Sequence, residues 1–503
     1  MKIFEQRLIR TIDAETIQRE GISSDALMER AASTVSDWIF ANVDPSRHIV
    51  IMAGPGNNGG DGLVIARHVA FAFNVSVYSY TGRNGSRSAD NALNFGRLDT
   101  SRMNVAVDDD YNPVFPDGCL VVDALFGTGL SRPLEGAYDS LVSTINNSHR
   151  EVLSVDLPSG MGDEESLTNI DSQPVVMATT TIAFQLSKLA FFLPETEKYL
   201  GRIVITDIGL SREAMDSLPS RYYYTDEASV SPLFRTRQRF VHKGDMGRAM
   251  IFAGSMGMMG AAQLAAKACM RSGVGLLTVV APRCGYEILQ VAVPEAMARV
   301  AGAECLTWNT GLFDSRIKAA AIGPGIGRDA DTTGVVLDFL TAYRNIPKVI
   351  DADALWHLAS LLGDSSFDVS LLNGSVLTPH DAEFDHLTCP HSSRYERIRA
   401  ARQFAVDYGV VVVLKGANTA VCLPDGDIHF NSTGNPGMAT GGSGDVLTGI
   451  VTALLAQGYT SHESAIMAVY MHGKAADNFV AHGSQMALVA SDIISELVGI
   501  WNV

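Results

Sequence analysis

The sequence predicts an α/β protein with two domains, and three observations support this prediction. The chain has 503 residues, more than one ordinary hydrophobic core can organise. In both halves, short apolar runs end in glycine-rich turns and lead into helical patterns, as in doubly wound α/β sheets. Between Leu210 and His242 this alternation stops, and polar residues and prolines take its place. We therefore place the junction near residues 216–226, with domains at 1–218 and 226–503.

The composition restricts the classes of partner. Hydrophobic residues make up 47% of the chain and charged residues 18%, as in a folded globular protein. The net charge of −17 argues against nucleic acid and anionic membranes, because both attract basic surfaces. The six cysteines form no CxxC pair, which argues against a zinc site or a disulfide framework. No apolar run has the length of a signal-peptide core or a membrane span, so we expect a cytoplasmic protein.

The first half begins with a helical pattern and then alternates strands with helices. Ser23 or Ser24 can cap a helix, whose apolar positions are Leu27, Met28, Ala31, Val35, Trp38 and Ile39. A strand at 48–53 runs into a glycine-rich turn at 54–62, and a helix is expected at 63–69. The turn does not have the GxGxxG spacing of a dinucleotide fingerprint. Further strands are expected at 75–80, 120–125 and 152–157.

Acidic residues follow three of these strands. Asp61, Asp123 and Asp156 each lie in a loop after a strand. The carboxyl ends of parallel strands form one edge of the sheet, and ligands bind at that edge. Aspartate and asparagine are also common turn formers, so each acid alone favours a structural role. The three acids together favour a binding site, and the amide and carboxylate oxygens of the turn suit a hard cation or a polar ligand.

The motifs at these strand ends resemble a known family. Residues 54–62 (GPGNNGGDG), 123–129 (DALFGTG) and 156–160 (DLPSG) are similar to the signature of the NAD(P)H-hydrate epimerase family, over residues 1–215. The resemblance implies a potassium ion held by Asn58, Asp123 and Ser159, and it makes Asp156 the candidate acid/base. It implies contacts with the hydrated dinucleotide from Asn57, Asn58, Gly59, Gly60, Asp61, Gly127, Thr128, Gly129, Leu130, Ser131, Arg132, Pro133 and Asp156.

The second half repeats the order of strand, glycine turn and helix. A strand at 249–253 precedes a turn at 254–260, whose methionines we expect to fill the core, and an alanine-rich helix at 261–270. A second glycine turn is expected at 323–327. Further strand patterns lie at 348–351, 376–380 and 410–414, and a hairpin is expected from 421–423 and 428–430.

The stretch with the clearest chemistry is 433–445 (TGNPGMATGGSGD). An apolar pattern of helical spacing follows it, so a helix is expected to begin near Asp445. A glycine loop before a helix directs free N–H groups and the positive end of the helix dipole at one point, which suits a phosphate or an oxyanion. A carboxylate beside such an anion is unfavourable unless it removes a proton. The alternative is a flexible turn with Asp445 as an ordinary N-cap.

The order of these motifs resembles the ribokinase-like fold and, more narrowly, the NAD(P)H-hydrate dehydratase family, over residues 226–500. The matching stretches are 323–327, 351–355, 378–380, 415–419 and 435–449. Where the family usually has a Gly-Glu and an Arg-Leu pair, this chain has Ala382-Glu383 and His386-Leu387. The resemblance implies contacts with the hydrate from Ala261, Gly325, His380 and Asp445. It implies contacts with the nucleotide from Lys415, Gly416, Ala417, Asn418, Thr419, Gly434, Asn435, Gly441, Gly442, Ser443 and Gly444.

Together the two halves resemble the bifunctional NAD(P)H-hydrate repair enzymes. The resemblance implies an N-terminal Rossmann-like three-layer α/β domain that interconverts the R and S hydrates of NADH and NADPH. It implies a C-terminal ribokinase-like α/β domain that dehydrates the S hydrate with ADP and Mg²⁺, giving AMP and phosphate. ADP is favoured over ATP because the fused architecture is similar to that of the prokaryotic enzymes. A homo-oligomer is expected.

The resemblance also suggests roles and leaves alternatives. Asp445 is expected to take the proton of the substrate hydroxyl while the N–H groups of 441–444 hold the transferred phosphoryl group. One alternative is a ribokinase-like kinase that phosphorylates a hydroxyl of a vitamin precursor and releases a stable phosphate ester. Another is a non-catalytic binding module, although the three acids of the first half argue against it.

Overall fold

The computed structural model describes residues 1–81, 85–108, 113–130 and 132–500, and its chain separates into two compact units. The N-terminal unit comprises residues 2–220 and 393–395, and the C-terminal unit comprises residue 1, residues 221–392 and the chain from 396 onward. Strand β9 (Tyr222–Thr225) lies in the gap between the predicted domain limits. It belongs to the C-terminal unit and pairs there with β18 (Ile428–Asn431).

A seven-stranded parallel sheet forms the centre of the N-terminal unit, in the order β4-β3-β2-β5-β6-β7-β8. The strands are β2 (His48–Ala53), β3 (Asn74–Ser79), β4 (Asn104–Val107), β5 (Leu120–Ala124), β6 (Glu151–Val155), β7 (Thr180–Phe184) and β8 (Arg202–Thr206), and a short β1 (Lys2–Ile3) precedes them. The α-helices are α1 (Gln6–Glu20), α2 (Ser24–Asn42), α3 (Asn57–Val69), α4 (Ala89–Gly96), α5 (Ala137–Asn147), α6 (Glu197–Leu200) and α7 (Arg212–Ser217).

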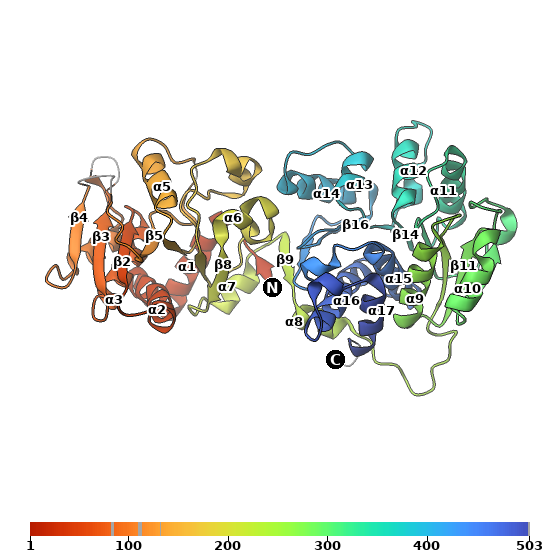
Figure 1. Ribbon diagram of the computed structural model, residues 1–503, viewed down its shortest axis with the longest axis horizontal. Helices are drawn as coiled ribbons and strands as arrows, with labels where there is room; N and C mark the ends of the chain where they lie inside the picture. The colour runs from red at the N-terminus through yellow and green to blue at the C-terminus, as the bar shows by residue number, and fades with distance from the viewer. Residues whose placement is uncertain (82–84, 109–112, 131, 501–503) are drawn as a thin grey trace. The chain divides into compact units, whose positions relative to one another are not determined.

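Helices cover both faces of this sheet, so its strands are apolar on both sides. On β2, Ile49 and Ile51 pack in one cluster with α2 and α3, while Val50 and Met52 pack in a second cluster with α5. Figure 1 shows α2 and α3 on one side of the strands and α5 on the other. This is the three-layer arrangement that the sequence predicts.

The C-terminal unit contains a larger mixed sheet in the order β9-β18-β17-β16-β15-β14-β13-β10-β11-β12. All neighbours are parallel except β16–β17 and β17–β18, which are antiparallel as the predicted hairpin requires. The remaining strands are β10 (Arg248–Phe252), β11 (Leu276–Ala281), β12 (Met297–Val300), β13 (Ala319–Ile322), β14 (Lys348–Ile350), β15 (Val376–Leu377), β16 (Val411–Leu414) and β17 (Ala420–Cys422).

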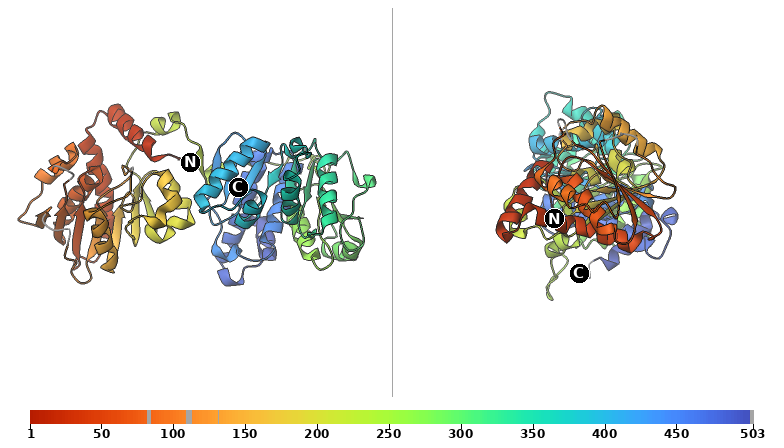
Figure 2. Two further views of the ribbon diagram at one scale, coloured as in Figure 1. Left: turned by 90° about the horizontal axis from the view of Figure 1, so that it is seen from above. Right: turned by 90° about the vertical axis from the view of Figure 1, so that its left-hand side faces the viewer.

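Two helical layers enclose this sheet as well (Figures 1 and 2). One layer contains α9 (Met259–Arg271), α15 (Ser443–Ala456), α16 (Ser461–Val480) and α17 (Ala490–Glu496), and the other contains α11 (Ala330–Ala342), α12 (Asp353–Leu362), α13 (Asp381–Leu387) and α14 (Arg394–Tyr408). The shorter helices α8 (Glu227–Val230) and α10 (Tyr286–Ala292) complete the unit. The predicted fold class, two α/β domains of these types, is confirmed.

Small residues let α15 lie directly against α9. A Cβ atom on Gly449 would lie 2.2 Å from the carbonyl oxygen of Ala265, so only glycine fits there. The facing residues Ala262, Ala265 and Ala266 of α9 are fully buried in the same core. This packing holds α15 rigidly, and α15 carries Asp445 in its first turn.

Two local predictions are wrong. The residues expected to form a turn after β2 form the first turns of α3, which begins at Asn57. The methionines of the turn at 254–260 do not all fill the core: Met259 is buried, but Met256 is 59% exposed and Met258 41%. None of the helices in the described part of the chain combines the length and the apolar character needed to cross a lipid bilayer.

Candidate active sites

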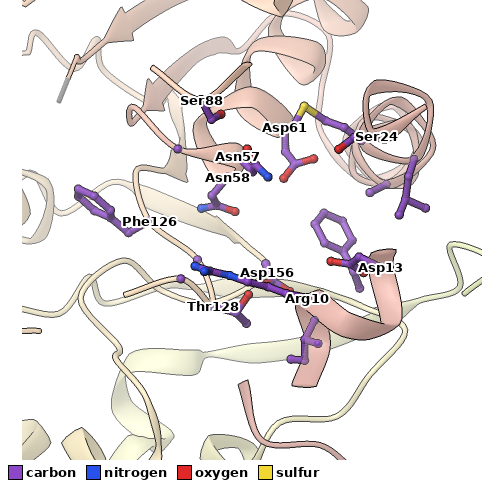
Figure 3. Close-up of a pocket in the computed structure, with 18 of the residues that line it drawn as sticks. Arg10, Asp13, Ser24, Asn57, Asn58, Asp61, Ser88, Phe126, Thr128 and Asp156 are labelled. Atoms are coloured by element: carbon purple, nitrogen blue, oxygen red, sulfur yellow. The ribbon is translucent and has the colours of Figure 1, made fainter. Parts of the chain in front are cut away.

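A pocket of about 660 Å³ opens at the carboxyl end of the N-terminal sheet. Its polar wall comes from the start of α3 and from the loops after β5 and β6, while α1 and α2 form the opposite side (Figure 3). The predicted residues that line it are Asn57, Asn58, Asp61, Gly127, Thr128, Gly129, Leu130 and Asp156. Apolar side chains line the remainder, including Ile9, Leu27, Phe126 and Ile208.

Four of the predicted contacts are not among the lining residues, and a fifth, Ser131, lies outside the described residues. Arg132 and Pro133 do not line the pocket. Gly59 and Gly60 lie inside α3 and serve packing: a Cβ on Gly59 would lie 1.9 Å from the oxygen of Gly54, and one on Gly60 would lie 2.7 Å from the sulfur of Met28. Their small size therefore lets α3 pack closely against its neighbours. In the sequence motif alone, a glycine with this packing role looks the same as a glycine that contacts a ligand.

Asp156 occupies the centre of the polar wall. Its Oδ1 atom lies 2.7 Å from Nζ of Lys188, and the two side chains are only 13% and 3% exposed. The backbone of Asp156 has a φ of 69°, in the left-handed region that aspartate tolerates better than most residues. A Cβ on Gly127 would lie 3.3 Å from Oδ2 of Asp156, so a glycine at 127 keeps the carboxylate accessible. The geometry gives Asp156 a buried counterion on one oxygen and an open pocket on the other side.

Two further acids, Asp13 and Asp61, line the same pocket, and Lys188, the partner of Asp156, acts on Asp13 as well. Burial and the charge of Asp156 raise the pKa of Asp13 to about 6, although Lys188 opposes this effect. Burial, with the charges of Asp156, Asp13 and Asp90, raises the pKa of Asp61 well above its ordinary value. Burial and the neighbouring acids therefore raise the pKa values of both Asp13 and Asp61, as is common at acid/base sites.

The sequence analysis missed Arg10, Asp13 and Lys188. Asp13 lies on α1 between Ile9 and Ile17, which line the same pocket, so the helical spacing places it on the inward face. Lys188 precedes the apolar run 189–193, but its burial and its pairing with Asp156 are visible only in the structure.

Of the three predicted potassium ligands, Asp123 and Ser159 are hydrogen-bonded to each other, while Asn58 lines the pocket. Asp123 is fully buried and accepts hydrogen bonds from the Ser159 hydroxyl at 2.5 Å, the Ser159 N–H at 2.9 Å and the Ser154 hydroxyl at 2.8 Å. Burial raises the pKa of Asp123, and these neutral donors oppose the effect. The buried Nδ2 atom of Asn58 has no hydrogen-bond partner in the structure. A buried acid with only neutral donors, beside an unsatisfied amide that could turn its oxygen inward, fits a weakly polarising cation.

The second site lies at the N-terminus of α15 in the C-terminal unit. The glycine loop ends at Gly442, which has a φ of 89° and caps the helix without a side-chain hydrogen bond. Asp445 lies in the first turn, partly buried. Burial, with the charges of Asp351, Asp353 and Glu383, raises the pKa of Asp445 to about 7 against the opposing effect of Lys415. Asp445 is therefore placed to accept a proton near neutral pH, where the free N–H groups of the helix end favour an anion.

Lys415 follows β16, interacts with the charge of Asp445 and forms ion pairs with two further acids. Its Nζ atom lies 3.2 Å from Oδ1 of Asp351, which follows β14, and 3.5 Å from Oε2 of Glu383 on α13. Burial acts to lower the pKa of Lys415, but Asp351 and Glu383 outweigh it and raise the pKa. The hydroxyl of Thr448 on α15 donates to the other oxygen of Asp351 at 2.6 Å. The two acids therefore favour the charged form of the lysine. The ammonium lies beside the glycine loop, because a Cβ on Gly444 would lie 3.4 Å from its Nζ.

The predicted hydrate contacts lie on neighbouring loops of the same sheet edge. A Cβ on Gly325, after β13, would lie 3.2 Å from the Cβ of Ala261 on α9, so these two residues are adjacent. His380 is exposed and caps α13: its Nδ1 accepts from the N–H of Glu383, and the Glu383 carboxylate accepts from the N–H of His380. Glu383 thus links His380 to Lys415, a connection that the sequence analysis did not identify.

Ala352 joins Asp351 to Asp353 in an unusual backbone conformation. Its φ of 49° lies in the left-handed region, where alanine is disfavoured. Asp353 then accepts from the N–H of Gly327 at 3.0 Å and from Nε of Arg328 at 2.9 Å. The turn at Ala352 thus places Asp351 and Asp353 so that the charges of both raise the pKa of Asp445.

The remaining predicted nucleotide residues form two neighbouring loops. Gly434 donates its N–H to Asp477 at 2.9 Å, and the Asn435 amide donates to the other oxygen of Asp477 at 2.9 Å. These contacts anchor the start of the glycine loop to α16. The Thr419 hydroxyl donates to the oxygen of Gly416 at 3.0 Å, which closes the turn after β16; Ala417 is exposed and Asn418 partly exposed. Gly441 lies in the loop before α15 and is exposed, and Ser443, the first residue of α15, is partly exposed.

The departure from the usual Arg-Leu pair has a structural counterpart. His386 stacks on Trp356 of α12, with ring centroids 3.7 Å apart and an interplanar angle of 9°. The guanidinium of Arg328 lies 4.7 Å from the centroid of the same Trp356 ring. The histidine therefore forms part of a stack with an arginine supplied by a different loop.

Comparisons with known proteins agree with both halves. Residues 24–190 match the family described as YjeF-related protein N-terminus, and residues 249–498 match the family described as NAD(P)H-hydrate dehydratase. The bifunctional NAD(P)H-hydrate repair enzyme Nnr of Moorella thermoacetica is 34% identical, over 95% of this chain and 92% of that protein. The enzymes of the same name from Thermofilum pendens and Escherichia coli K12 are 32% and 30% identical, over 99% and 98% of this chain and 95% and 93% of those proteins.

Solved structures resemble the C-terminal half. The ADP/ATP-dependent NAD(P)H-hydrate dehydratase of Bacillus subtilis, co-crystallised with ATP and Mg²⁺, is 30% identical over 56% of this chain and 97% of that one, with a TM-score of 0.47. From the full-length similarity at 34% identity, with a pocket and an acid-bearing glycine loop in the matched halves, it follows that the chain belongs to the family of bifunctional NAD(P)H-hydrate repair enzymes.

Proposed function

We propose that the N-terminal unit interconverts the R and S hydrates of NADH and NADPH, and that the C-terminal unit dehydrates the S hydrate with ADP, giving AMP and phosphate. The observation that carries the proposal is Asp445, a proton acceptor with a pKa of about 7 in the first turn of α15. Around it, Lys415 and the glycine loop supply positive charge and N–H groups.

Dehydration of the hydrate needs a better leaving group than hydroxide. Water has a pKa of about 15.7, so hydroxide leaves slowly. A phosphate leaves far more easily because its second pKa is about 6. Transfer of a phosphoryl group from the nucleotide to the hydroxyl, followed by elimination of phosphate, restores the ring double bond. Asp445 removes the hydroxyl proton in the first step, and the backbone N–H groups of residues 441–444 hold the transferred group.

Lys415 contributes the positive charge of this site. Its ion pairs with Asp351 and Glu383 hold the ammonium next to Gly444, at the N-terminus of α15. Mg²⁺ supplied with the nucleotide would neutralise part of the phosphate charge, while Asp351 and Asp353 are held by Lys415 and Arg328. His380, held by Glu383, then faces the hydrate from the neighbouring loop.

The polar groups of the epimerase site form two sets, one for the substrate and one for the potassium ion. Asp156, paired with Lys188, contacts the reacting ring from the loop after β6. Asn58, Asp123 and Ser159 would hold potassium behind it, where the ion balances buried negative charge and fixes the loops after β5 and β6. The homo-oligomeric state and the cytoplasmic location stay predictions of the sequence.

The choice of nucleotide is tested by assaying the full chain with hydrated NADH, first with ADP and then with ATP. We expect regeneration of NADH, followed at its absorbance band, with stoichiometric phosphate and faster turnover with ADP. Faster turnover with ATP would overturn the assignment of ADP. The competing kinase function predicts a stable phosphate ester without NADH, so analysis of the products separates the two functions.

Potassium is expected to stabilise the N-terminal unit and to be required for epimerisation. A ligand at ten times its dissociation constant stabilises by about 1.4 kcal/mol, which is about 3–6 °C in Tm for a unit of this size. Replacement of Na⁺ by K⁺ should therefore raise the Tm of the wild type but not of Asp123→Asn, while dehydration stays unchanged in both salts. An equal shift in the variant would contradict the assignment of Asp123 as a ligand.

A further inference from the structure

Asp13 lines the N-terminal pocket, but unlike Asp61 and Asp156 it is not among the residues predicted to contact the hydrate. It lies on α1, on the opposite side of the pocket from the loop that carries Asp156 (Figure 3). It is partly buried and lines the pocket together with Arg10 of the same helix. Within the described residues, the Asp13 carboxylate forms no side-chain hydrogen bond or ion pair. Its carboxylate is therefore available to a bound molecule.

The chemistry of epimerisation asks for two proton-transfer groups. Water adds to an enamine at the carbon next to nitrogen, so the hydrate carries its hydroxyl on that carbon. Inversion by loss and re-addition of water breaks the C–O bond with a proton donated to the departing oxygen, while the ring nitrogen supplies the electron pair for a C=N bond. A water molecule then adds from the other face and gives up a proton, so one water leaves, one enters and no oxidant is needed. One group on each face of the ring satisfies both steps.

We propose that Asp13 is the second catalytic residue of the epimerase site, acting on the face of the ring opposite to Asp156. This inference rests on the proposed epimerase function. In one direction Asp13 protonates the departing hydroxyl while Asp156 accepts the proton of the incoming water. In the other direction the two residues exchange roles, as microscopic reversibility requires.

The groups that face Asp13 come from every element around the pocket. Arg10 lies on α1, Asp61 on α3, Asp156 on the loop after β6 and Lys188 on the loop after β7. Burial and Asp156 raise the pKa of Asp13 to about 6, against Lys188, so the carboxyl exchanges protons near neutral pH. Asp61 fits this role less well, because it lies on α3, in the same polar wall as the loop that carries Asp156.

The test measures the appearance of R hydrate from pure S hydrate by chromatography, with the full chain and without nucleotide. Asp13→Asn is expected to lose about 10²–10³-fold in the rate of interconversion, and Asp13→Glu should recover part of it. Glu15→Gln is the matched control, because Glu15 lies on the same helix, does not line the pocket and pairs with Arg19. Dehydration of the S hydrate with ADP, measured on the same preparations, should be unchanged and reports that the chain is folded.

The pH dependence separates a catalytic role from a structural one. The wild-type rate from S to R should fall as the pH rises through about 6, because the donating form of Asp13 is lost. That decline should disappear in Asp13→Asn. A variant with more than a third of the wild-type rate, or one that is slow but keeps the decline, would overturn the proposal. Absence of interconversion in the wild type would instead overturn the epimerase function itself.

Discussion

Replacement of Asp445 by asparagine is expected to slow dehydration of the S hydrate by about 10²–10⁴-fold, the usual contribution of a general base. Asparagine has nearly the same shape but cannot accept the hydroxyl proton. The glycine loop, Lys415 and its ion pairs do not depend on this side chain, so nucleotide binding should persist. The experiment compares kcat with ADP for the two proteins and measures nucleotide affinity by calorimetry.

The pH profile gives an independent check of the same residue. Because Asp445 acts in its deprotonated form, wild-type dehydration should rise with pH up to about 7 and then level off. The raised pKa also affects stability: the stabilising effect of a protonated Asp445 is fully present below about pH 4 and is lost as the pH rises through about 7. Without ligands, Asp445→Asn should therefore be more stable than the wild type at pH 8, on the order of 1–3 kcal/mol.

A matched control is available in the same unit. Asp338 is exposed on α11, so Asp338→Asn removes the same charge without touching the site. Its dehydration rate and Tm should follow those of the wild type at both pH values. If Asp445→Asn kept near-normal turnover with ADP, the general-base role would be excluded.

Replacement of Asp156 is expected to abolish interconversion of the two hydrates while sparing dehydration. The carboxylate lies 2.7 Å from Lys188 and faces the pocket, and its loss leaves a buried ammonium without a partner. We expect about a 10²–10⁴-fold loss. The assay follows R hydrate formed from S hydrate and, in parallel, NADH formed with ADP.

Two substitutions separate the carboxylate from the backbone. Asp156→Asn tolerates the φ of 69° and removes only the charge, whereas Asp156→Ala adds the cost of a left-handed alanine of about 1 kcal/mol. Both should lose interconversion, and the alanine variant should also melt at a lower temperature. Loss of both activities in a folded variant would contradict the assignment of separate sites to the two units.

The glycine and acid motifs predicted the positions of the two sites, but the sequence did not indicate every contributor. Asp445 was predictable because a glycine loop and a helical pattern are local features. Asp13 and Lys188 meet Asp156 only after the chain has folded, since 143 residues separate Asp13 from Asp156 and 32 separate Lys188 from it. Gly59 and Gly60 were predicted to contact the ligand but serve packing. A glycine in a ligand-binding loop and a glycine at a close helix contact look the same in a single sequence.

Glu383 illustrates a third kind of limit. The sequence analysis names it only in the Ala382-Glu383 pair, and the structure shows that it caps α13 together with His380. The same side chain also reaches Lys415, 32 residues later, because β15 and β16 are neighbours in the sheet. A residue can thus have a local role that is visible in sequence and a distant role that is not.

The backbone at Ala352 has a consequence for how the family can vary. Ala352 has φ 49° and ψ −125°, a combination that glycine adopts freely and residues with a Cβ rarely adopt, so substitution there should be restricted to glycine beside alanine. In a saturation library this position should be as intolerant as a residue that binds substrate, although its methyl group has no chemistry to offer. Intolerance to substitution would then reflect the backbone turn that positions Asp351 and Asp353, and not contact with any ligand.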